Sequence, residues 1–265
     1  MSKISKAMEK ADRERGRGEC PAPAERGADP GRDGRPVEPR ADEAVTARRV
    51  PAAPLEPLES VDEYHALASE IYLALPDVRS RIVMVTSAAD GEGTSTVARE
   101  FARTIASTTE VDTLLVDANL RHPSHHKAFR ALQDPGLTDA VLGGVSVDQC
   151  IQRTQVPHLS LMAAGRRVVA PPRVFTDPSL DDVLGSIRRS YPLAILDMPP
   201  LLSFPGGLQL SRRVDGVVLV IRAGHTKRQL IELTVEQLRD AEANVLGTVL
   251  NRRRFYIPRM IYERL

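Results

Sequence analysis

The sequence contains no tryptophan, and aromatic residues make up only 4% of its 265 residues. A surface that binds nucleic-acid bases by stacking needs aromatic side chains, so this composition argues against one. An excess of charge of one sign is also missing, because 36 Lys and Arg balance 35 Asp and Glu to a net charge of +1. We therefore expect no nucleic-acid partner.

Cysteines and long hydrophobic runs are equally scarce. The two cysteines, Cys20 and Cys150, are too few for a disulfide framework, which favours a cytoplasmic protein. The most apolar run, 216–221, has the length of a strand and is far shorter than the roughly 20 residues that span a bilayer. Residues 1–6 contain no apolar core of a signal peptide. These absences argue against secreted, collagen-like and integral-membrane classes.

The composition changes near residue 58. Residues 1–58 contain eight of the 20 prolines, together with 12 Lys or Arg and 11 Asp or Glu. Apolar periodicity is almost absent, so this segment cannot bury enough apolar surface to offset the entropy lost on ordering. We predict a disordered tail over 1–58, which is either simply solvated or used to dock a partner.

From residue 59 onward, short apolar runs alternate with helical patterns. A helix is predicted over 61–75, where leucine and isoleucine recur every four residues. Another helical pattern, 226–241, contains Leu230, Leu233 and Leu238. The predicted strands are 81–86, 114–117, 159–162, 193–197, 217–221 and 245–250.

This alternation predicts an α/β fold of the P-loop NTPase type. Continuous apolar strands separated by helices indicate a mostly parallel sheet with helices on both faces. In such sheets, ligands bind outside the carboxyl ends of the strands. Three features of the sequence fall there: the loop 87–95 after the first strand, Asp117 after the second, and Asp197 after the fourth.

The loop after the first strand contains Gly91 and Gly93 and precedes a helix. Glycines allow backbone N–H groups to converge on a phosphate, and the helix N-terminus adds positive potential. A P-loop also needs a lysine on the β- and γ-phosphates and a hydroxyl on Mg²⁺. Ser95 provides the hydroxyl, but Thr94 stands at the lysine position, and the loop has no other lysine. On its own, the same pattern would also fit an ordinary structural turn.

Two acids, Asp117 and Asp197, each end an apolar strand. Acids at strand ends beside a phosphate loop commonly hold Mg²⁺ and its waters. A single acid at such a position more often caps a helix or joins an ion pair. The loop and both acids in this order favour a nucleotide site.

With these motifs, the sequence resembles the bacterial tyrosine kinases (BY-kinases), the cytoplasmic kinase part of the polysaccharide co-polymerases of exopolysaccharide synthesis. That family belongs to the deviant Walker-A ATPases. The resemblance covers about residues 60–251, so we place a BY-kinase-like domain at 59–251. The segments that carry it are GEGTS (91–95) for Walker A, VDANLRHP (116–123) for Walker A′, ILDMPP (195–200) for Walker B, and VLGTVLN (245–251).

The resemblance implies that ATP or ADP and Mg²⁺ are the cofactors, and it assigns residues to them. Catalysis would depend on Asp117, which would position or activate the acceptor tyrosine hydroxyl, and on Asp197, which would hold the water shell of Mg²⁺. The residues implied in nucleotide binding are Gly91, Glu92, Gly93, Thr94, Ser95, Thr96, Arg121 and Asn251. The residues implied in metal binding are Ser95, Asp117, Asn119 and Asp197.

The departures from the family pattern all remove charge. Thr94 replaces the Walker A lysine, Asn119 replaces the second acid of Walker A′, and the region of Gly206 lacks a further Asp that the family usually has. One cation at a phosphoryl-transfer transition state is worth about 10³–10⁵ in rate, more than its contribution to binding. We therefore expect weak nucleotide binding, weak or absent kinase activity, and a regulatory role toward a membrane polysaccharide co-polymerase or chain-length protein on a separate chain.

Two basic or polar segments remain. Residues 252–265 contain five arginines interleaved with apolar and aromatic residues, and they either form a solvated end or bind anionic lipid headgroups at the inner face of the cell membrane. His122, His125 and His126 form a small cluster that favours a polar loop, with a metal site as the alternative. The reason is that no cysteine and no clear fourth ligand lies nearby in the sequence.

Three alternatives stay open. The first is an active ATP-dependent tyrosine autokinase of the same pathway. The second is a dinucleotide oxidoreductase, because Gly91, Gly93 and Asp117 fit its spacing, although Thr96 stands where the third glycine is expected. The third is a partitioning or cell-positioning ATPase of the same superfamily, whose signature lysine would fall at Ala89.

Overall fold

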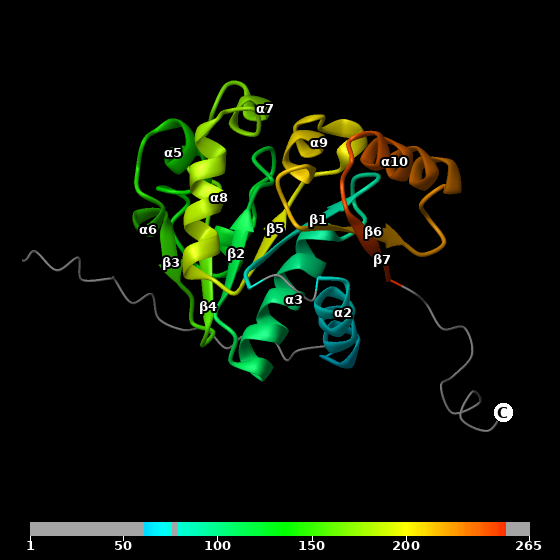
Figure 1. Cartoon of the computed structure of the whole chain (residues 1–265), viewed down its shortest axis with the longest axis horizontal. Helices are drawn as coiled ribbons and strands as arrows, with labels where there is room; N and C mark the ends of the chain where they lie inside the picture. Colours follow the sequence, from blue (N-terminus) through cyan, green and yellow to red (C-terminus); the bar gives the residue numbers. More distant parts are fainter. Residues whose placement is uncertain (1–60, 76–78, 253–265) are drawn as a thin grey trace, which may run out of the picture. The chain divides into compact units, whose positions relative to one another are not determined.

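A computed structural model describes residues 61–75 and 79–252 (Figure 1). The predicted tail 1–58 and the segment beyond Arg252 lie outside these residues. The strands are β1 Arg81–Ser87, β2 Thr113–Asp117, β3 Ile151–Arg153, β4 Leu159–Met162, β5 Leu193–Asp197, β6 Gly216–Arg222 and β7 Val245–Asn251. The helices are α2 Val61–Ala74, α3 Thr94–Thr109, α4 His125–Ala128, α5 Leu137–Leu142, α6 Val147–Cys150, α7 Pro171–Val174, α8 Ser179–Ser190, the 3₁₀ turn η1 Leu201–Ser203, α9 Gly206–Ser211 and α10 Arg228–Asp240.

The strands form one sheet in the order β3-β4-β2-β5-β1-β6-β7. Neighbouring strands are parallel except for β3, which pairs antiparallel with β4. The mostly parallel sheet and its six principal strands are confirmed, with each strand within two residues of its predicted bounds. The short β3 is not revealed by the sequence, because three residues are too few to produce a recognisable pattern.

Helices cover both faces of the sheet (Figure 1). Alternate residues of a strand point to opposite faces, and β1 shows both. Ile82 and Met84 belong to a core with α5, α7, α8 and α9, while Val83 and Val85 belong to a second core with α2 and α3. Burial on both faces explains why these strands read as continuous apolar runs.

The predicted helix near residue 230 is confirmed as α10, but its leucines do not share one buried face. Leu238 is fully buried, whereas Leu233 is 44% exposed. Thr234 is buried in its place, and its hydroxyl donates a hydrogen bond to the carbonyl of Leu230 at 2.7 Å. The buried face of α10 therefore contains Thr234 and Leu238, which are four residues apart. None of the helices in the described ranges combines the length and the apolar character needed to cross a bilayer.

The centre of the sheet brings together the segments that matter for function. Asp117 at the end of β2 lies in register with Asp197 at the end of β5, and Asp197 lies in register with Val85 of β1. The loop that follows β1 leads directly into α3. The two acids and the glycine loop thus meet at the carboxyl edge of the sheet, as the fold class predicts.

Candidate functional site

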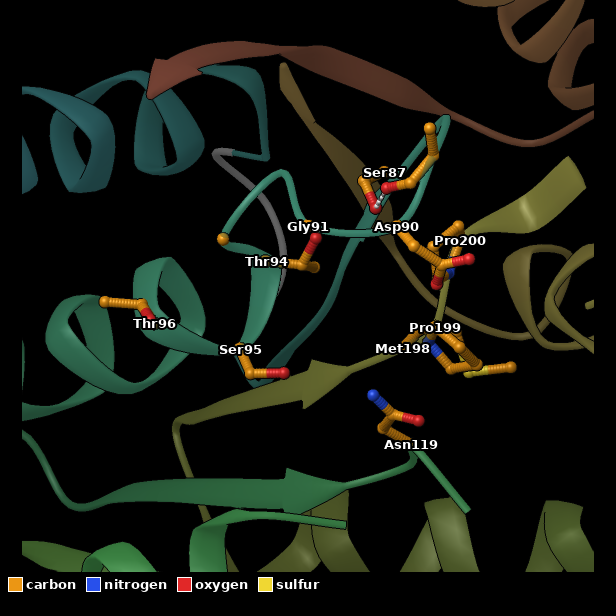
Figure 2. Close-up of a pocket in the computed structure, with 12 residues that line it drawn as sticks. Ser87, Asp90, Gly91, Thr94, Ser95, Thr96, Asn119, Met198, Pro199 and Pro200 are labelled. Atoms are coloured by element: carbon orange, nitrogen blue, oxygen red, sulfur yellow. Dashed lines mark hydrogen bonds between the residues drawn. The ribbon is translucent and has the colours of Figure 1, made fainter. Parts of the chain in front are cut away.

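The loop 88–93 between β1 and α3 borders a pocket of about 210 Å³ (Figure 2). This volume is below the roughly 300–1,000 Å³ of pockets that enclose a whole drug-sized ligand, so the pocket can enclose only part of a nucleotide. Its lining residues are Ser87, Ala89, Asp90, Gly91, Gly93, Thr94, Ser95, Thr96, Asn119, Met198, Pro199 and Pro200.

Two glycines give the loop its course. Gly91 and Gly93 have φ values of 78° and 88°, in the left-handed region that residues with a side chain avoid. A Cβ atom at Gly93 would also lie 2.3 Å from the amide nitrogen of Asn251, whereas one at Gly91 would meet nothing within 4 Å. Gly93 is therefore required both by its left-handed backbone and by the close approach of Asn251, whereas Gly91 is required by its backbone alone.

This difference predicts unequal effects of two matched substitutions. Gly91→Ala should lower the free energy of unfolding by about 1 kcal/mol, the cost of placing a side chain in the left-handed region. Gly93→Ala should cost at least about 1 kcal/mol more, because the methyl group also displaces Asn251. Urea unfolding of both variants measures the difference, and equal losses would contradict the close approach of Asn251 to the loop.

The loop is fixed from behind by Glu92 and Asn251. The Glu92 carboxylate is buried and accepts hydrogen bonds from the N–H of Ala88 at 3.2 Å and the hydroxyl of Thr226 at 2.5 Å. The side-chain amide of Asn251 donates to the carbonyl oxygen of Glu92 at 2.8 Å. Neither Glu92 nor Asn251 lines the pocket, so in this structure both hold the loop in place rather than facing a ligand.

The pocket itself offers hydrogen-bond donors but no positive side chain. Asp90, an acid, is the only acidic or basic residue among its lining residues, all of which belong to the described ranges. Thr94, the first residue of α3, stands where a P-loop places its lysine. In Figure 2 the Ser95 hydroxyl points toward the Asn119 amide, and Thr96, which also lines the pocket, follows it in α3.

Arg121 does not supply the missing charge in this structure. Its guanidinium carbon lies 5.0 Å from the centre of the Phe204 ring, at cation–π distance. The residue does not line the pocket. The positive potential that remains there comes from the backbone N–H groups at the N-terminus of α3.

The two strand-end acids lie outside the pocket lining and form a buried cluster with a histidine. Asp117 and Asp197 are both fully buried, and neither lines the pocket. One oxygen of Asp117 accepts hydrogen bonds from the N–H groups of Ser124 and His125 at 2.9 and 3.0 Å. The Nε2 atom of His125 lies 2.9 Å from an oxygen of Asp197. His125 thus connects both acids.

The sequence does not identify His125 as part of this site. It sits in a polar stretch between Ser124 and His126, yet its side chain is fully buried. The one available signal is Phe129, four residues later and also buried, which places His125 on the inward face of the α4 turn. The interpretation of His125 as a polar-loop residue is therefore wrong.

The acid–histidine cluster perturbs the pKa values of its members. Burial raises the pKa of Asp117 to about 6, and the negative charge of Asp197 adds to this, while His125 and two backbone N–H groups act in the opposite direction. Burial alone lowers the pKa of His125, but its hydrogen bond with Asp197 and the charges of both carboxylates raise it overall. Both groups consequently hold protons more tightly than they do in water.

Comparison with curated protein sequences finds tyrosine-protein kinases. The chain is 30% identical over 190 residues to tyrosine-protein kinase YwqD of Bacillus subtilis, which covers 72% of this chain and 80% of YwqD. It is 31% identical over 207 residues to the putative tyrosine-protein kinase EpsB of Ralstonia solanacearum, but that match covers only 27% of EpsB. No protein-family model matches the sequence.

Comparison with solved structures finds kinase domains and related ATPases. The kinase domain of VpsO is 28% identical with a TM-score of 0.65, over 73% of this chain and 95% of that one. The kinase domain of the Escherichia coli tyrosine kinase ETK is 24% identical, with a TM-score of 0.68 over 74% and 78% of the two chains. Cobyrinic acid a,c-diamide synthase of Mycobacterium smegmatis, solved with bound ADP and magnesium, shares the fold at 16% identity and a TM-score of 0.57, over 64% of this chain and 74% of that one.

Proposed function

This chain belongs to the family of bacterial tyrosine kinases, and from that premise we propose that it is a kinase-like protein of exopolysaccharide synthesis with weak or absent kinase activity. The observation that carries the proposal is the charge of the phosphate pocket. Among its lining residues in the described ranges, no side chain is basic, and Asp90 is the one acid. A pocket without a positive side chain binds nucleotide through backbone donors and metal.

The parts that remain still fit a nucleotide with Mg²⁺. The left-handed Gly91 and Gly93 expose backbone N–H groups, and α3 directs its N-terminus at the same pocket. The Ser95 hydroxyl is placed to hold Mg²⁺. The amide nitrogen of Asn119 faces Ser95, and its oxygen accepts a hydrogen bond from the N–H of His122 at 3.1 Å. Mg²⁺ would supply the positive charge that no side chain provides there, so binding should depend on the metal.

The acids needed for phosphoryl transfer are less well placed. In an active kinase Asp117 would position the acceptor tyrosine hydroxyl and Asp197 would hold the water shell of Mg²⁺. Here both are buried and neither lines the pocket, and His125 is hydrogen-bonded to an oxygen of Asp197. Together with Thr94 in the lysine position, this arrangement favours binding over catalysis.

Calorimetric titration of the full chain with Mg·ATP and Mg·ADP, followed by an autophosphorylation assay, tests the proposal. We expect weak binding that disappears with EDTA, and no phosphotyrosine above background by mass spectrometry, because one cation at the transition state is worth about 10³–10⁵ in rate. Robust autophosphorylation that Asp117→Asn abolishes would instead establish the alternative, an active tyrosine autokinase.

The partner that fits this reading is a membrane polysaccharide co-polymerase or chain-length protein, with the chain acting as a regulatory module at the cytoplasmic face of the membrane. The arginines of 252–265 would add attraction to anionic lipids, at about 1 kcal/mol for each residue near the surface. Replacing Arg252, Arg253 and Arg254 by alanine should therefore strongly reduce sedimentation with phosphatidylserine vesicles.

The matched control for that experiment replaces the same three arginines by lysine, which keeps the charge. The lysine variant should sediment like the unmodified chain, and 0.5 M salt should release both. Equal sedimentation of the alanine variant and the unmodified chain would show that these arginines do not bind lipid.

A further inference from the structure

The loop 163–170, which joins β4 to α7, lies among exposed apolar side chains. Val169 of this loop is fully exposed, Leu132 is 68% exposed and Leu142 is 40% exposed. These three are half of the six large apolar side chains that are exposed in the described residues. Single apolar residues on a surface need no explanation, but a group of them in one place marks a surface of contact.

Contacts between neighbouring residues bring these three side chains to the same loop. The carbonyl of Gln133, next to Leu132, accepts the N–H of Gly165 at 2.9 Å, and its side-chain amide donates to the carbonyl of Gly165 at 3.0 Å. At Gly143, next to Leu142, a Cβ atom would lie 2.5 Å from a guanidinium nitrogen of Arg166. Helices α5, which ends at Leu142, and α7 are in contact, and both lie in the upper left part of Figure 1.

The backbone at these positions is held although the side chains face solvent. The side-chain amide of Gln152 in β3 bonds both the N–H and the carbonyl of Leu132, at 2.9 and 2.8 Å. The Asp139 carboxylate accepts the N–H of Arg166 at 3.1 Å and pairs with its guanidinium at 2.7 Å. Val168 packs against the core, and Val169 follows it at the surface. A partner therefore meets a preformed surface and does not have to order the loops.

Positive charge surrounds the exposed apolar side chains. The segments 127–136 and 163–177 contain five Lys or Arg and two Asp. Asp139, which lies between them in the sequence, is already paired with Arg166, while Arg167 and Arg173 are exposed. Arginines around apolar side chains match the surface of an anionic bilayer, where charged headgroups cover an apolar interior. An acidic protein segment would match the arginines but would leave the valine and leucines without apolar contacts.

We propose that this surface binds an anionic lipid bilayer, with its arginines on the headgroups and its apolar side chains inserted among them. We call it the basic–apolar surface, and its residues are Leu132, Leu142, Arg166, Arg167, Val169 and Arg173. The proposal rests on the proposed function for the location of the chain at a membrane, but not for nucleotide binding or kinase activity.

The place of the basic–apolar surface in the sheet has a consequence for the phosphate pocket. The loop 163–170 follows β4 at the carboxyl edge of the sheet, and Arg252 follows β7 at the same edge. The pocket is lined from the ends of β1, β2 and β5, which lie between β4 and β7 in the strand order. Binding through the basic–apolar surface therefore turns the edge that contains the pocket toward the bilayer.

Insertion can be measured in the full chain with a single fluorophore, because the sequence contains no tryptophan. With phosphatidylserine vesicles, the emission of Val169→Trp should shift to the blue and be quenched by brominated lipid, whereas phosphatidylcholine vesicles should change neither. Leu73→Trp is the matched control, because Leu73 is 74% exposed on α2, and its emission should stay unchanged with both. An emission of Val169→Trp that phosphatidylserine vesicles leave unchanged, or that both lipids change equally, would overturn the proposal.

Variants of the two exposed arginines test the charge. Replacing Arg167 and Arg173 together by alanine should weaken binding to phosphatidylserine vesicles by about 30-fold, at about 5-fold for each arginine near an anionic surface. Replacing both by lysine keeps the charge and should leave the affinity unchanged.

The same vesicle measurement separates this proposal from the proposed function. If the alanine variant of Arg252, Arg253 and Arg254 loses binding and the alanine variant of Arg167 and Arg173 does not, the basic–apolar surface is refuted while the proposed function stands. Binding of the chain to polyglutamate but not to vesicles would assign the surface to an acidic protein segment and would also refute the lipid proposal.

Discussion

Replacing Thr94 by lysine is expected to tighten ATP binding by roughly one to two orders of magnitude. Thr94 is the first residue of α3 and lines the phosphate pocket, so a lysine there reaches the β- and γ-phosphates. One charge-assisted hydrogen bond to phosphate is worth about 1.5–3 kcal/mol, which sets this range. Calorimetric titration with Mg·ATP of the variant and the unmodified chain measures the gain.

Two control variants separate charge from size and from position. Thr94→Met adds length without charge and should leave the affinity near that of the unmodified chain. Ser107→Lys adds the same charge near the far end of α3, at an exposed residue that does not line the pocket, and should gain little. An unchanged affinity of Thr94→Lys would mean that this loop does not face a phosphate. Phosphorylation need not return in Thr94→Lys, because Asn119 and the buried acids are unchanged.

Much of the fold follows from local patterns in the sequence. The strands are buried on both faces, so each is a continuous apolar run that ends at a polar residue such as Asp117 or Asp197. The parallel arrangement then predicts that the loop after β1 and both acids meet at one edge of the sheet. The structure confirms this meeting through the register of β2 and β5.

The details of the site depend on contacts between distant residues, which local patterns do not contain. Glu92 faces inward because the hydroxyl of Thr226, 134 residues later, donates a hydrogen bond to its carboxylate. The side-chain amide of Asn251 donates to the carbonyl oxygen of Glu92 across 159 residues. His125 reaches Asp197 across 72 residues. A histidine between polar neighbours carries no sign of such a partner, so sequence analysis assigns it to a surface loop.

Because Asp117 is buried, we expect the Asp117→Asn substitution to stabilise the metal-free protein at neutral pH. The pKa of Asp117 is raised from 3.8 to about 6, chiefly by burial. Between these values the native protein binds more protons than the unfolded chain, so this group makes the free energy of unfolding fall as the pH rises. His125 acts in the same direction, because its pKa is also raised and its favourable charge is lost at high pH.

Asparagine keeps an oxygen that can accept hydrogen bonds from the N–H groups of Ser124 and His125, but it carries no charge. The stability advantage of Asp117→Asn should therefore be near zero at pH 4 and grow toward about 3 kcal/mol above pH 7. Urea unfolding in the presence of EDTA, at intervals between pH 4 and pH 8, measures this difference. Asp112→Asn is the matched control, because Asp112 is exposed at the surface and its replacement should change the stability by less than about 0.5 kcal/mol at any pH. An Asp117→Asn variant that is less stable than the unmodified chain at pH 8 would show that the carboxylate is stabilised as an anion, contrary to the burial that raises its pKa.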